Sequence, residues 1–306
     1  MVNRHIYFDT ATLYYRAYYA VPESITAPDG TPSGAVRSFL DMVSTLLTQF
    51  PPDEVVFAWD DDWRPAWRVA LVPSYKTHRA EDEQGEAIEV VPDTLGPQID
   101  AIRNILDAIG LPRIGQDGHE ADDILGSLVH QRPGATAVVT GDRDLFQLVD
   151  DESDVQVISI IKGIKNLEVI TDDYLINRFG VSGRQYVDYA TLRGDASDGL
   201  PGVKGVGEKT ASSLVATFGS IAGLIAAVDS QSAPIKQGVI DKINSHREYI
   251  EAARKVVTTR TDAKLPKSLA IPKKVADPAD LEFLIGDWGI ERQVTRLLKT
   301  LNIRLT

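Results

Sequence analysis

Four short apolar runs in the first half of the chain alternate with longer stretches in which apolar residues recur at a helical spacing. The runs are rich in β-branched and aromatic residues and are predicted to be strands: His5–Asp9, Glu54–Asp60, Ala135–Asp142 and Asp154–Ile161. Between them, Ser33–Phe50 and Leu95–Ile109 have the 3.6-residue period of amphipathic helices, and Gly110 ends the second one. Strands that alternate with helices predict a parallel sheet with helices on its faces.

The pattern changes near residue 172, where clear strand-like runs end. Helices joined by Gly and Pro turns are predicted over Asp172–Phe179, Gly183–Leu192, Glu208–Thr217, Ile221–Val228 and Ile235–Val257. Another amphipathic helix is predicted around Glu291–Leu301. We therefore expect an α/β unit over residues 1–171 and a second, mostly helical unit over residues 172–306.

Composition narrows the class of protein. Of the 306 residues, 43% are hydrophobic and 25% are charged, which excludes a wholly disordered chain. The absence of Cys excludes disulfides, thiolate metal sites and a Cys nucleophile, and fits a cytoplasmic location. The N-terminus lacks the apolar run of a signal peptide. Residues 210–228 carry no charge, but Gly219 and Ser220 divide them into two short helices, so we expect no membrane span.

Three of the predicted strands end in an acid, at Asp9, Asp60 and Asp142. A single Asp in such a place is more simply a turn residue or a helix cap. Ligands of an open parallel sheet bind at the carboxyl ends of its strands, so three such acids together favour a site at that edge. The net charge of −12 argues against a nucleic-acid ligand unless the acids gather around metal ions.

Further acids lie in three later segments. Glu120, Asp122 and Asp123 precede an apolar helix, where one or two acids would serve as a helix cap. If all three converge on a site, Glu120 must lie in the turn before the helix. The remaining carboxylates are those of Asp144, which follows Asp142, and of Asp195 and Asp198.

These nine carboxylates in five segments would repel one another strongly unless cations neutralise them. Oxygen ligands without Cys or paired His select hard ions, Mg²⁺ or Mn²⁺ rather than Ca²⁺, and the residue order of an EF-hand is absent. Two such ions about 4 Å apart are the usual machinery of phosphodiester cleavage.

A basic segment follows the second predicted strand. Lys76, His78 and Arg79 lie within one helical turn, after Arg68, and could bind phosphate or stabilise transition-state charge. An ordinary solvated basic patch is the alternative. The next stretch, Glu81–Asp93, has acids but no Lys or Arg and is expected to be an exposed, mobile connection.

A Gly-rich hairpin over residues 202–207 precedes the helix predicted to begin at residue 208. Backbone N–H groups at that helix N-terminus could hold a phosphate, with Lys204 and Lys209 adding positive charge. Gly205 and Gly207 would let the backbone approach DNA closely without reading its bases. The spacing matches neither a P-loop nor a dinucleotide fingerprint.

In this order, the motifs resemble those of the bacterial 5′ nuclease or flap endonuclease family, which includes the N-terminal nuclease domain of DNA polymerase I. The similarity covers roughly residues 5–260. It rests on Tyr7-Phe-Asp with Tyr15-Arg-Ala-Tyr-Tyr, Gly34-Ala-Val with Phe39, Trp67-Arg-x6-Tyr-Lys-x2-Arg, Glu120-Ala-Asp-Asp, Gly141-Asp-x-Asp-Leu-x-Gln-Leu and Gly194-Asp-x-Ser-Asp-x3-Gly-x2-Gly-x-Gly-Glu-Lys-Thr-Ala.

The resemblance implies an α/β fold: a mostly parallel sheet flanked by helices (a 5′ nuclease, PIN-like core), with a C-terminal helical domain. Within it we expect a basic arch or clamp near residues 72–97 and a helix–hairpin–helix near residues 186–218. The implied activity is cleavage of 5′ ends and 5′ flaps of branched DNA in replication and repair, with two Mg²⁺ or Mn²⁺ ions. K⁺ is the typical monovalent ion at the hairpin.

The resemblance also assigns roles by position in the motifs. The first metal group is Asp9, Asp60, Glu120, Asp122 and Asp123, and the second is Asp142, Asp144, Asp195 and Asp198. Lys76 and Arg79 match the catalytic basic residues at the base of the arch. The residues expected to contact DNA are Arg68, Tyr75, Gly202, Lys204, Gly205, Gly207 and Lys209.

Two departures from the family pattern leave alternatives open. The second strand ends in three consecutive acids: spacing from Trp67 gives Asp61 as the ligand, whereas extension of the strand gives Asp60, which we favour. The acidic stretch after Arg79 leaves open whether a full arch forms. Because no polymerase domain follows residue 306, we expect a stand-alone enzyme and a monomer.

Two other functions compete with this one. A phosphatase of the Asp-x-Asp type would use Asp60 as nucleophile and Asp62 as acid and base, but Trp63 follows where a small hydroxyl residue is needed. A DNA-binding scaffold would use the hairpin alone, and the acids would then hinder binding.

Overall fold

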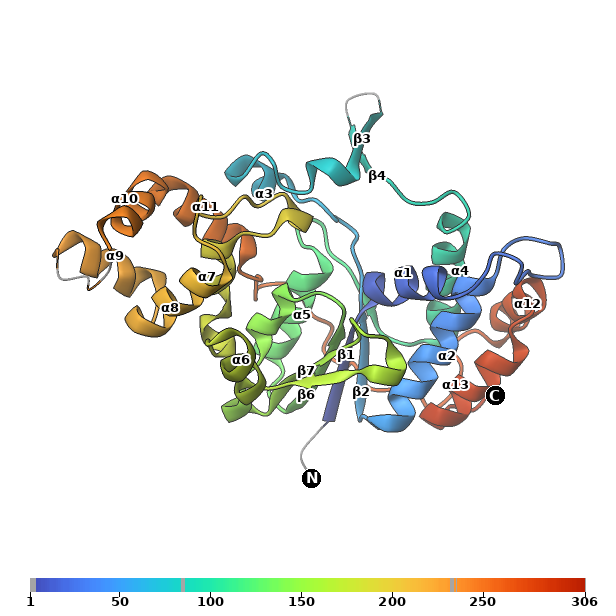
Figure 1. Ribbon diagram of the computed structural model, residues 1–306. Coiled ribbons are helices and arrows are strands. Elements are labelled where there is room, and N and C mark those ends of the chain that lie inside the picture. Colours follow the sequence, from blue (N-terminus) through green and yellow to red (C-terminus); the bar gives the residue numbers. More distant parts are fainter. Residues whose placement is uncertain (1–3, 84–85, 232–233, 235, 306) are drawn as a thin grey trace.

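A six-stranded sheet forms the centre of the computed structural model, which describes residues 4–83, 86–231, 234 and 236–305 (Figure 1). The strand order is β5-β2-β1-β6-β7-β8; β7 and β8 pair antiparallel and the other neighbours pair parallel. The strands are β1 (Arg4–Asp9), β2 (Glu54–Ala58), β5 (Arg113–Ile114), β6 (Ala135–Thr140), β7 (Val155–Ser159) and β8 (Glu168–Ile170). The mostly parallel α/β sheet predicted from the sequence is confirmed.

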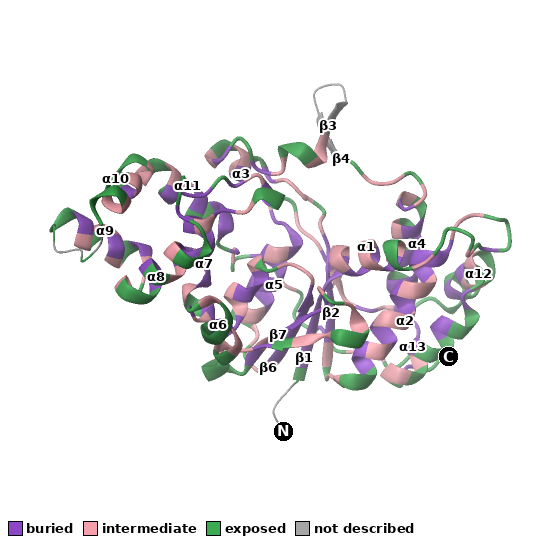
Figure 2. Cartoon of the chain, in the orientation of Figure 1, coloured by how far each residue is buried: buried purple, intermediate pink, exposed green. Residues whose placement is uncertain are grey.

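Both faces of the sheet are buried, which explains why its strands read as continuous apolar runs. In β1, Ile6 and Phe8 belong to one apolar cluster and Tyr7 to the other. Helices α1 (Thr10–Ala20), α2 (Gly34–Gln49) and α4 (Gly96–Ile109) contribute to the first cluster, and α5 (Ala121–Gln131) contributes to the second. Figure 2 shows the buried strands between helices whose outer faces are exposed.

The second cluster continues from the sheet into the helical part of the chain. Val138 of β6 and Leu125 of α5 share it with Tyr186 and Leu214. The helices are α6 (Asp172–Phe179), α7 (Gly183–Arg193), α8 (Glu208–Phe218), α9 (Ile221–Asp229), α10 (Gln237–Ser245) and α11 (Arg247–Val257). The single helix predicted over residues 235–257 is therefore wrong: the structure describes two helices, which meet at His246.

The uncharged stretch from residue 210 to 228 is divided as expected. Helices α8 and α9 are bent by 78° at the break, and the Ser220 side chain accepts from the Gly223 N–H to cap α9. Among the described residues, no single helix is long and apolar enough to cross a membrane, although this bent pair passes on length and composition alone.

The last two helices return to the α/β unit. Helices α12 (Pro278–Trp288) and α13 (Glu291–Leu301) lie beside α4 and α2 (Figure 1). Leu281, Val294 and Leu297 are buried in the same apolar cluster as Phe8. The expectation that residues 172–306 form one helical unit is corrected in this respect, because the amphipathic α13 buries its apolar face against α2.

A small hairpin projects from the body where a mobile connection was expected. Strands β3 (Ala80–Glu83) and β4 (Glu86–Glu89) pair antiparallel, and they follow α3 (Ala66–Leu71) and one turn of 3₁₀ helix at Thr77–Arg79 (Figure 1). Residues 84 and 85, within the expected arch segment 72–97, lie outside the described residues.

The packing of α13 predicts a large stability effect. Replacing the fully buried Leu297 by Ala should lower the free energy of unfolding by about 2–5 kcal/mol, because it removes apolar contacts and leaves a cavity. Urea unfolding of the variant measures this. Phe283→Ala on α12, where the side chain is 67% exposed, is the control and should change stability by at most about 0.5 kcal/mol. Equal effects of the two changes would contradict the packing described here.

Candidate active site

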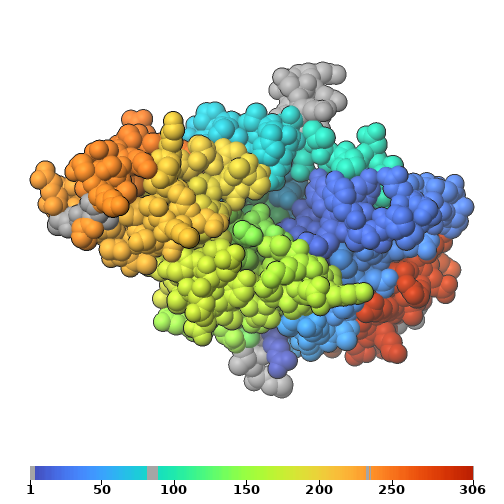
Figure 3. Space-filling view, viewed as in Figure 1, coloured from blue at the N-terminus to red at the C-terminus, as the bar shows by residue number. Residues whose placement is uncertain are grey.

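A cleft of about 760 Å³ opens at the carboxyl ends of β1, β2 and β6. In the space-filling view, the surface is hollowed where α1, the segment after β2 and the loop after α7 meet (Figure 3). The lining includes eight of the predicted site residues: Asp9, Asp60, Lys76, Arg79, Glu120, Asp122, Asp142 and Asp195. The structure therefore brings together acids that are far apart in the sequence.

The sheet itself places the first two acids. Asp9 is the last residue of β1 and the N-cap of α1, and it accepts hydrogen bonds from the Thr12 N–H (3.3 Å) and the Thr140 hydroxyl (2.7 Å). In the parallel register Asp9 lies opposite Ala58, so Asp60 follows at the same edge. Asp60 accepts from the Ala121 N–H at 2.7 Å, which ties the end of β2 to the start of α5.

The three consecutive acids after β2 have different surroundings. Asp60 lines the cleft, whereas Asp61 is exposed and lies against Gly115. Asp62 accepts from the Gly118 N–H at 3.0 Å. The geometry favours Asp60 over Asp61 as the cleft acid. It disfavours the pairing of Asp60 with Asp62 that a phosphatase of the Asp-x-Asp type would need.

Burial and neighbouring acids raise the pKa values of four aspartates at the cleft, Asp60, Asp122, Asp142 and Asp144. Burial raises the pKa of Asp60 to about 6, and burial together with the Asp198 carboxylate raises the pKa of Asp142 to about 6. The pKa values of Asp122 and Asp144 lie well above the usual range because partial burial removes both groups from water and the Asp142 carboxylate is nearby. Such a site holds more negative charge than the described cations balance.

A divalent cation fits this arrangement. Within the described part of the chain, Oδ1 of Asp144 is buried and accepts no hydrogen bond, as an oxygen awaiting a cation would be. Among the same residues, no group of three carboxylate or His side chains has the geometry of a formed metal site. Mg²⁺ usually keeps several of its waters and binds through one or two carboxylates, so it does not require a closed cage.

The basic segment lies against the loop that carries Asp195 and Asp198. The Lys76 N–H donates to the Asp198 carbonyl at 3.0 Å, and Nη2 of Arg79 donates to Oδ1 of Asp198 at 2.7 Å. A Cβ at Gly199 would lie 2.1 Å from the Ser74 carbonyl oxygen, so only glycine permits this close approach.

Lys76 is held in an uncommon conformation beside Glu120. Its φ of 48° is in the left-handed region, and its ammonium group donates to Oε2 of Glu120 at 2.9 Å. Burial lowers the pKa of Lys76, but the Glu120 carboxylate outweighs burial and the pKa lies well above its usual value. Lys76 therefore keeps a positive charge inside the cleft.

Three predicted site residues are placed elsewhere. Asp123 is fully buried and binds the Arg68 guanidinium through both carboxylate oxygens (2.7 and 2.8 Å), so it faces Arg68 and not the cleft. Arg68 is 2% exposed and Tyr75 is 3% exposed, and the Tyr75 hydroxyl donates to Glu120. The structure does not place these three groups where the predicted contacts with a cation (Asp123) and with DNA (Arg68 and Tyr75) require them, because their polar atoms are bonded within the protein.

The hairpin between α7 and α8 exposes most of its predicted DNA contacts. Lys204, Gly205, Gly207 and Lys209 are exposed, whereas Gly202 is buried. The Gly202 N–H donates to the Tyr249 hydroxyl oxygen, and a Cβ at Gly202 would lie 2.4 Å from the Arg193 carbonyl oxygen. Gly202 therefore shapes the hairpin and is not available as a DNA contact, which corrects that prediction.

Some residues at the site carry no role in the sequence interpretation. Tyr15, Arg16 and Glu89 line the cleft, and the Lys242 ammonium donates to the Gly205 carbonyl at 3.0 Å. The motif Tyr15-Arg-Ala-Tyr-Tyr marks the first two. Glu89 and Lys242 are single charged residues, which spacing alone does not single out.

The N-terminal resolvase-like domain of 5′–3′ exonucleases matches residues 4–180, and their C-terminal SAM fold matches residues 181–278. The chain belongs to the 5′–3′ exonuclease family. It is 47% identical over 296 residues to a 5′–3′ exonuclease of Streptomyces coelicolor, covering 96% of this chain and 98% of that protein. It is 40% identical to a 5′–3′ exonuclease of Mycobacterium tuberculosis, covering 97% of each.

This chain also resembles part of a larger protein and two solved structures. The chain is 35% identical to DNA polymerase I of Mycobacterium bovis, over 83% of this chain and 27% of that protein. The fold is similar to that of the T5 5′-exonuclease with bound zinc (TM-score 0.65, 16% identity, 97% and 99% of the two chains). It is also similar to human GEN1 in complex with Holliday junction DNA (TM-score 0.62, 17% identity, 97% and 71%).

The raised pKa of Asp60 predicts a pH-dependent loss of stability. The folded protein binds this proton more tightly than the unfolded chain does, so the contribution of Asp60 to stability falls as pH rises from about 4 to about 6. In EDTA at pH 7.5, Asp60→Asn should raise the free energy of unfolding by about 1–3 kcal/mol, and the gain should vanish near pH 4. Urea unfolding at both pH values measures it.

The neighbouring acid supplies the control. Asp61→Asn changes an exposed side chain and should alter stability by less than about 0.5 kcal/mol at either pH. A gain for Asp61→Asn that equals the gain for Asp60→Asn would show that general charge reduction, and not burial of Asp60, is responsible.

Proposed function

We propose that the chain is a structure-specific 5′ nuclease that hydrolyses phosphodiesters at 5′ ends and 5′ flaps of branched DNA, as a monomer, in replication and repair. The observation that carries the proposal is the cleft itself, in which six of the predicted metal-binding carboxylates, from five segments of the chain, line the same cavity as Lys76, Arg79 and Glu89. Such a cluster suits divalent cations, Mg²⁺ or Mn²⁺, and a phosphate group between the two kinds of charge.

The carboxylates fall into two groups along the cleft. Asp9, Asp60, Glu120 and Asp122, from β1, the end of β2 and the start of α5, would hold one cation. A second cation would be held by Asp142, Asp144, Asp195 and Asp198. Two bound cations supply a water of lowered pKa and stabilise the charge that develops on the phosphate.

Lys76 and Arg79 act on the same phosphate. The Lys76 ammonium is partly buried in the cleft wall, where it can stabilise negative charge more strongly than in water. Arg79 has a 38% exposed side chain beside Asp198, so its guanidinium can reach a phosphate oxygen by leaving this partner.

The hairpin supplies a separate site for the duplex. Gly207 is the N-cap of α8, and glycine has no side chain that could accept hydrogen bonds from the first backbone N–H groups of the helix. These N–H groups can face a phosphate, and Lys204 and Lys209 lie close to them in the sequence. Carbonyl groups of this hairpin are the proposed ligands of K⁺. Contacts of this kind give binding that does not depend on base sequence.

Cleavage of a fluorescent 5′-flap DNA in Mg²⁺ or Mn²⁺ tests the proposal against its two rivals. A 5′ nuclease cuts the flap DNA and leaves p-nitrophenyl phosphate intact, whereas a phosphatase does the reverse. A DNA-binding scaffold binds the flap DNA and cuts neither substrate. Only the first outcome supports the proposal.

The orphaned oxygen of Asp144 predicts a loss of rate without a loss of DNA binding. Asp144→Asn should lower the single-turnover cleavage rate by ~10²-fold or more, because a cation ligand is lost, while DNA affinity stays level or rises. Rapid-quench cleavage and fluorescence anisotropy measure the two quantities. Asp173→Asn, an exposed acid on α6, is the matched control. Full activity of Asp144→Asn would remove this residue from the metal group.

The exposed hairpin predicts a change in salt dependence. Lys209→Ala should weaken binding of duplex DNA and reduce the slope of log K against log salt by about 1, since one phosphate contact is lost. Lys299→Ala on α13, an equally exposed lysine on the other side of the sheet, should leave the slope unchanged. An unchanged slope for Lys209→Ala would exclude a phosphate contact at this residue.

A further inference from the structure

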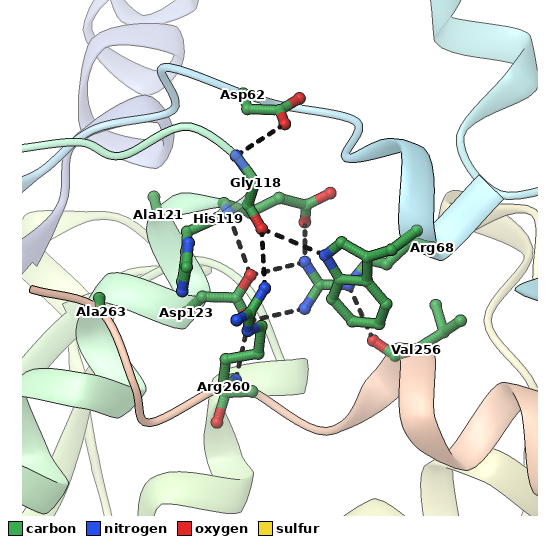
Figure 4. Close-up of polar contacts among 12 residues, drawn as sticks. Asp62, Arg68, Gly118, His119, Ala121, Asp123, Val256, Arg260 and Ala263 are labelled. Carbon is green, nitrogen blue, oxygen red and sulfur yellow. Dashed lines mark hydrogen bonds and ion pairs between the residues drawn. The ribbon is translucent and has the colours of Figure 1, made fainter. Parts of the chain in front are cut away.

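A second charged cluster lies behind the cleft, and the proposed chemistry makes no direct use of the pair at its centre. Its centre is the buried pair of Arg68 on α3 and Asp123 on α5 (Figure 4). Buried ion pairs add little net stability compared with apolar side chains of similar size. The cluster therefore needs an explanation other than stability.

Arg68 joins three parts of the chain. Two of its N–H groups donate to the carboxylate of Asp123, and its Nε donates to the Val256 carbonyl at 3.0 Å, at the end of α11. Nη1 also lies 3.6 Å from Oε2 of Glu120, within ion-pair distance. The central carbon of the guanidinium lies 4.5 Å from the centre of the Trp67 ring, a cation–π contact. This contact and the hydrogen bonds together fix the orientation of the guanidinium plane.

Asp123 fixes the backbone around the cleft. Besides the two bonds from Arg68, its carboxylate accepts from the Glu120 N–H at 3.0 Å and the Arg260 N–H at 2.8 Å (Figure 4). The Glu120 side chain in turn caps α5, so Glu120 and Asp123 form a capping box. The position of the Glu120 backbone thus depends on the carboxylate of Asp123.

The charges of the cluster balance within it. Glu120 and Asp123 are negative, Lys76 and Arg68 are positive, and the Tyr75 hydroxyl donates to both oxygens of Glu120 at 3.1 and 2.9 Å. Lys76 is shared with the cleft, and so is Glu120. Its carboxylate is therefore oriented from behind by Arg68 and Tyr75 and from the cleft by Lys76.

We propose that Arg68, Asp123 and Tyr75 are positioning residues that hold Glu120 and Lys76 in the geometry that cleavage requires. The inference rests on the proposed nuclease function and adds to it that the rate depends on groups that touch neither DNA nor cation. It also explains why Val256, at the end of α11, and Arg260, just after it, are hydrogen-bonded to Arg68 and Asp123 at the base of the cleft.

The positioning role differs in its consequences from the two roles that the sequence suggested. A cation ligand at Asp123 would act without Arg68, and a DNA contact at Arg68 would act without Asp123. A positioning pair acts as a unit, so removal of either member has the effect of removing both.

The test is a double-mutant cycle on the full chain with Arg68→Lys, Asp123→Asn and the double variant. Each should lower the single-turnover rate on 5′-flap DNA by ~10-fold or more, and the double variant should be no slower than the slower single variant. The dissociation constant for DNA, measured without divalent cations, should change less than ~3-fold with an unchanged salt slope. Relative to the unaltered protein, the Mg²⁺ concentration that gives the half-maximal rate should change by the same factor in both single variants.

The matched control is a bidentate pair at the opposite end of α5. Arg132 donates to both oxygens of Glu54 at 2.5 and 3.0 Å, far from the cleft acids, so Arg132→Lys should leave the rate of the folded protein unchanged. If the Arg68 or Asp123 variants do not fold, Tyr75→Phe decides, since it removes only the hydroxyl that donates to Glu120. This variant should lower the rate ~10-fold at unchanged DNA affinity.

Three results would overturn the inference: unchanged rates of folded variants, additive effects of the two single changes, or a lower salt slope for Arg68→Lys. These outcomes are distinct from failure of the proposed function. If neither the unaltered protein nor Arg132→Lys cuts flap DNA, the nuclease proposal itself fails.

Discussion

Mutual repulsion of carboxylates at one edge of a parallel sheet is the constraint on which the rest of this structure depends. Parallel strands bring their carboxyl ends to the same edge, so Asp9, Asp60 and Asp142 meet there although they are widely separated in the sequence. Burial then raises the pKa values of Asp60 and Asp142. The chain tolerates this only because Lys76 lies among these acids and because divalent cations, in the proposed function, complete the neutralisation.

The same constraint explains the unusual local geometry around the cleft. Lys76 adopts a left-handed φ, and Gly199 allows two loops to come within contact distance, so that basic and acidic segments interlock. Such strain persists only where the surroundings hold it. Here the Glu120 carboxylate holds Lys76 in place, and Tyr75 and Arg68 contact the same carboxylate.

Much of this arrangement could be predicted from the sequence, because strand order and a 3.6-residue period are local signals. The meeting of the strand-terminal acids follows from the parallel sheet alone. The roles of Asp123 and Arg68 did not follow, because a motif records residue types and not directions: Glu120 and Asp123 are three residues apart, which is also the spacing of a capping box. Strand β5, with two residues, is too short to have a pattern, and the packing of α12 and α13 on α2 and α4 is a long-range contact that periodicity does not reveal.

The α/β part and the helical part of the chain share one apolar cluster. This shared packing bears on which phosphodiester the proposed nuclease would cut. Val138 of β6, Leu200 of the loop after α7 and Val206 of the hairpin are buried in the same cluster. The hairpin follows Asp195 and Asp198 by only a few residues and is hydrogen-bonded to the Leu192 carbonyl and the Tyr249 hydroxyl. In the proposed function, a duplex held at the hairpin would therefore lie at a fixed distance from the cleft acids. Packing, rather than base recognition, would then determine which phosphodiester is cut.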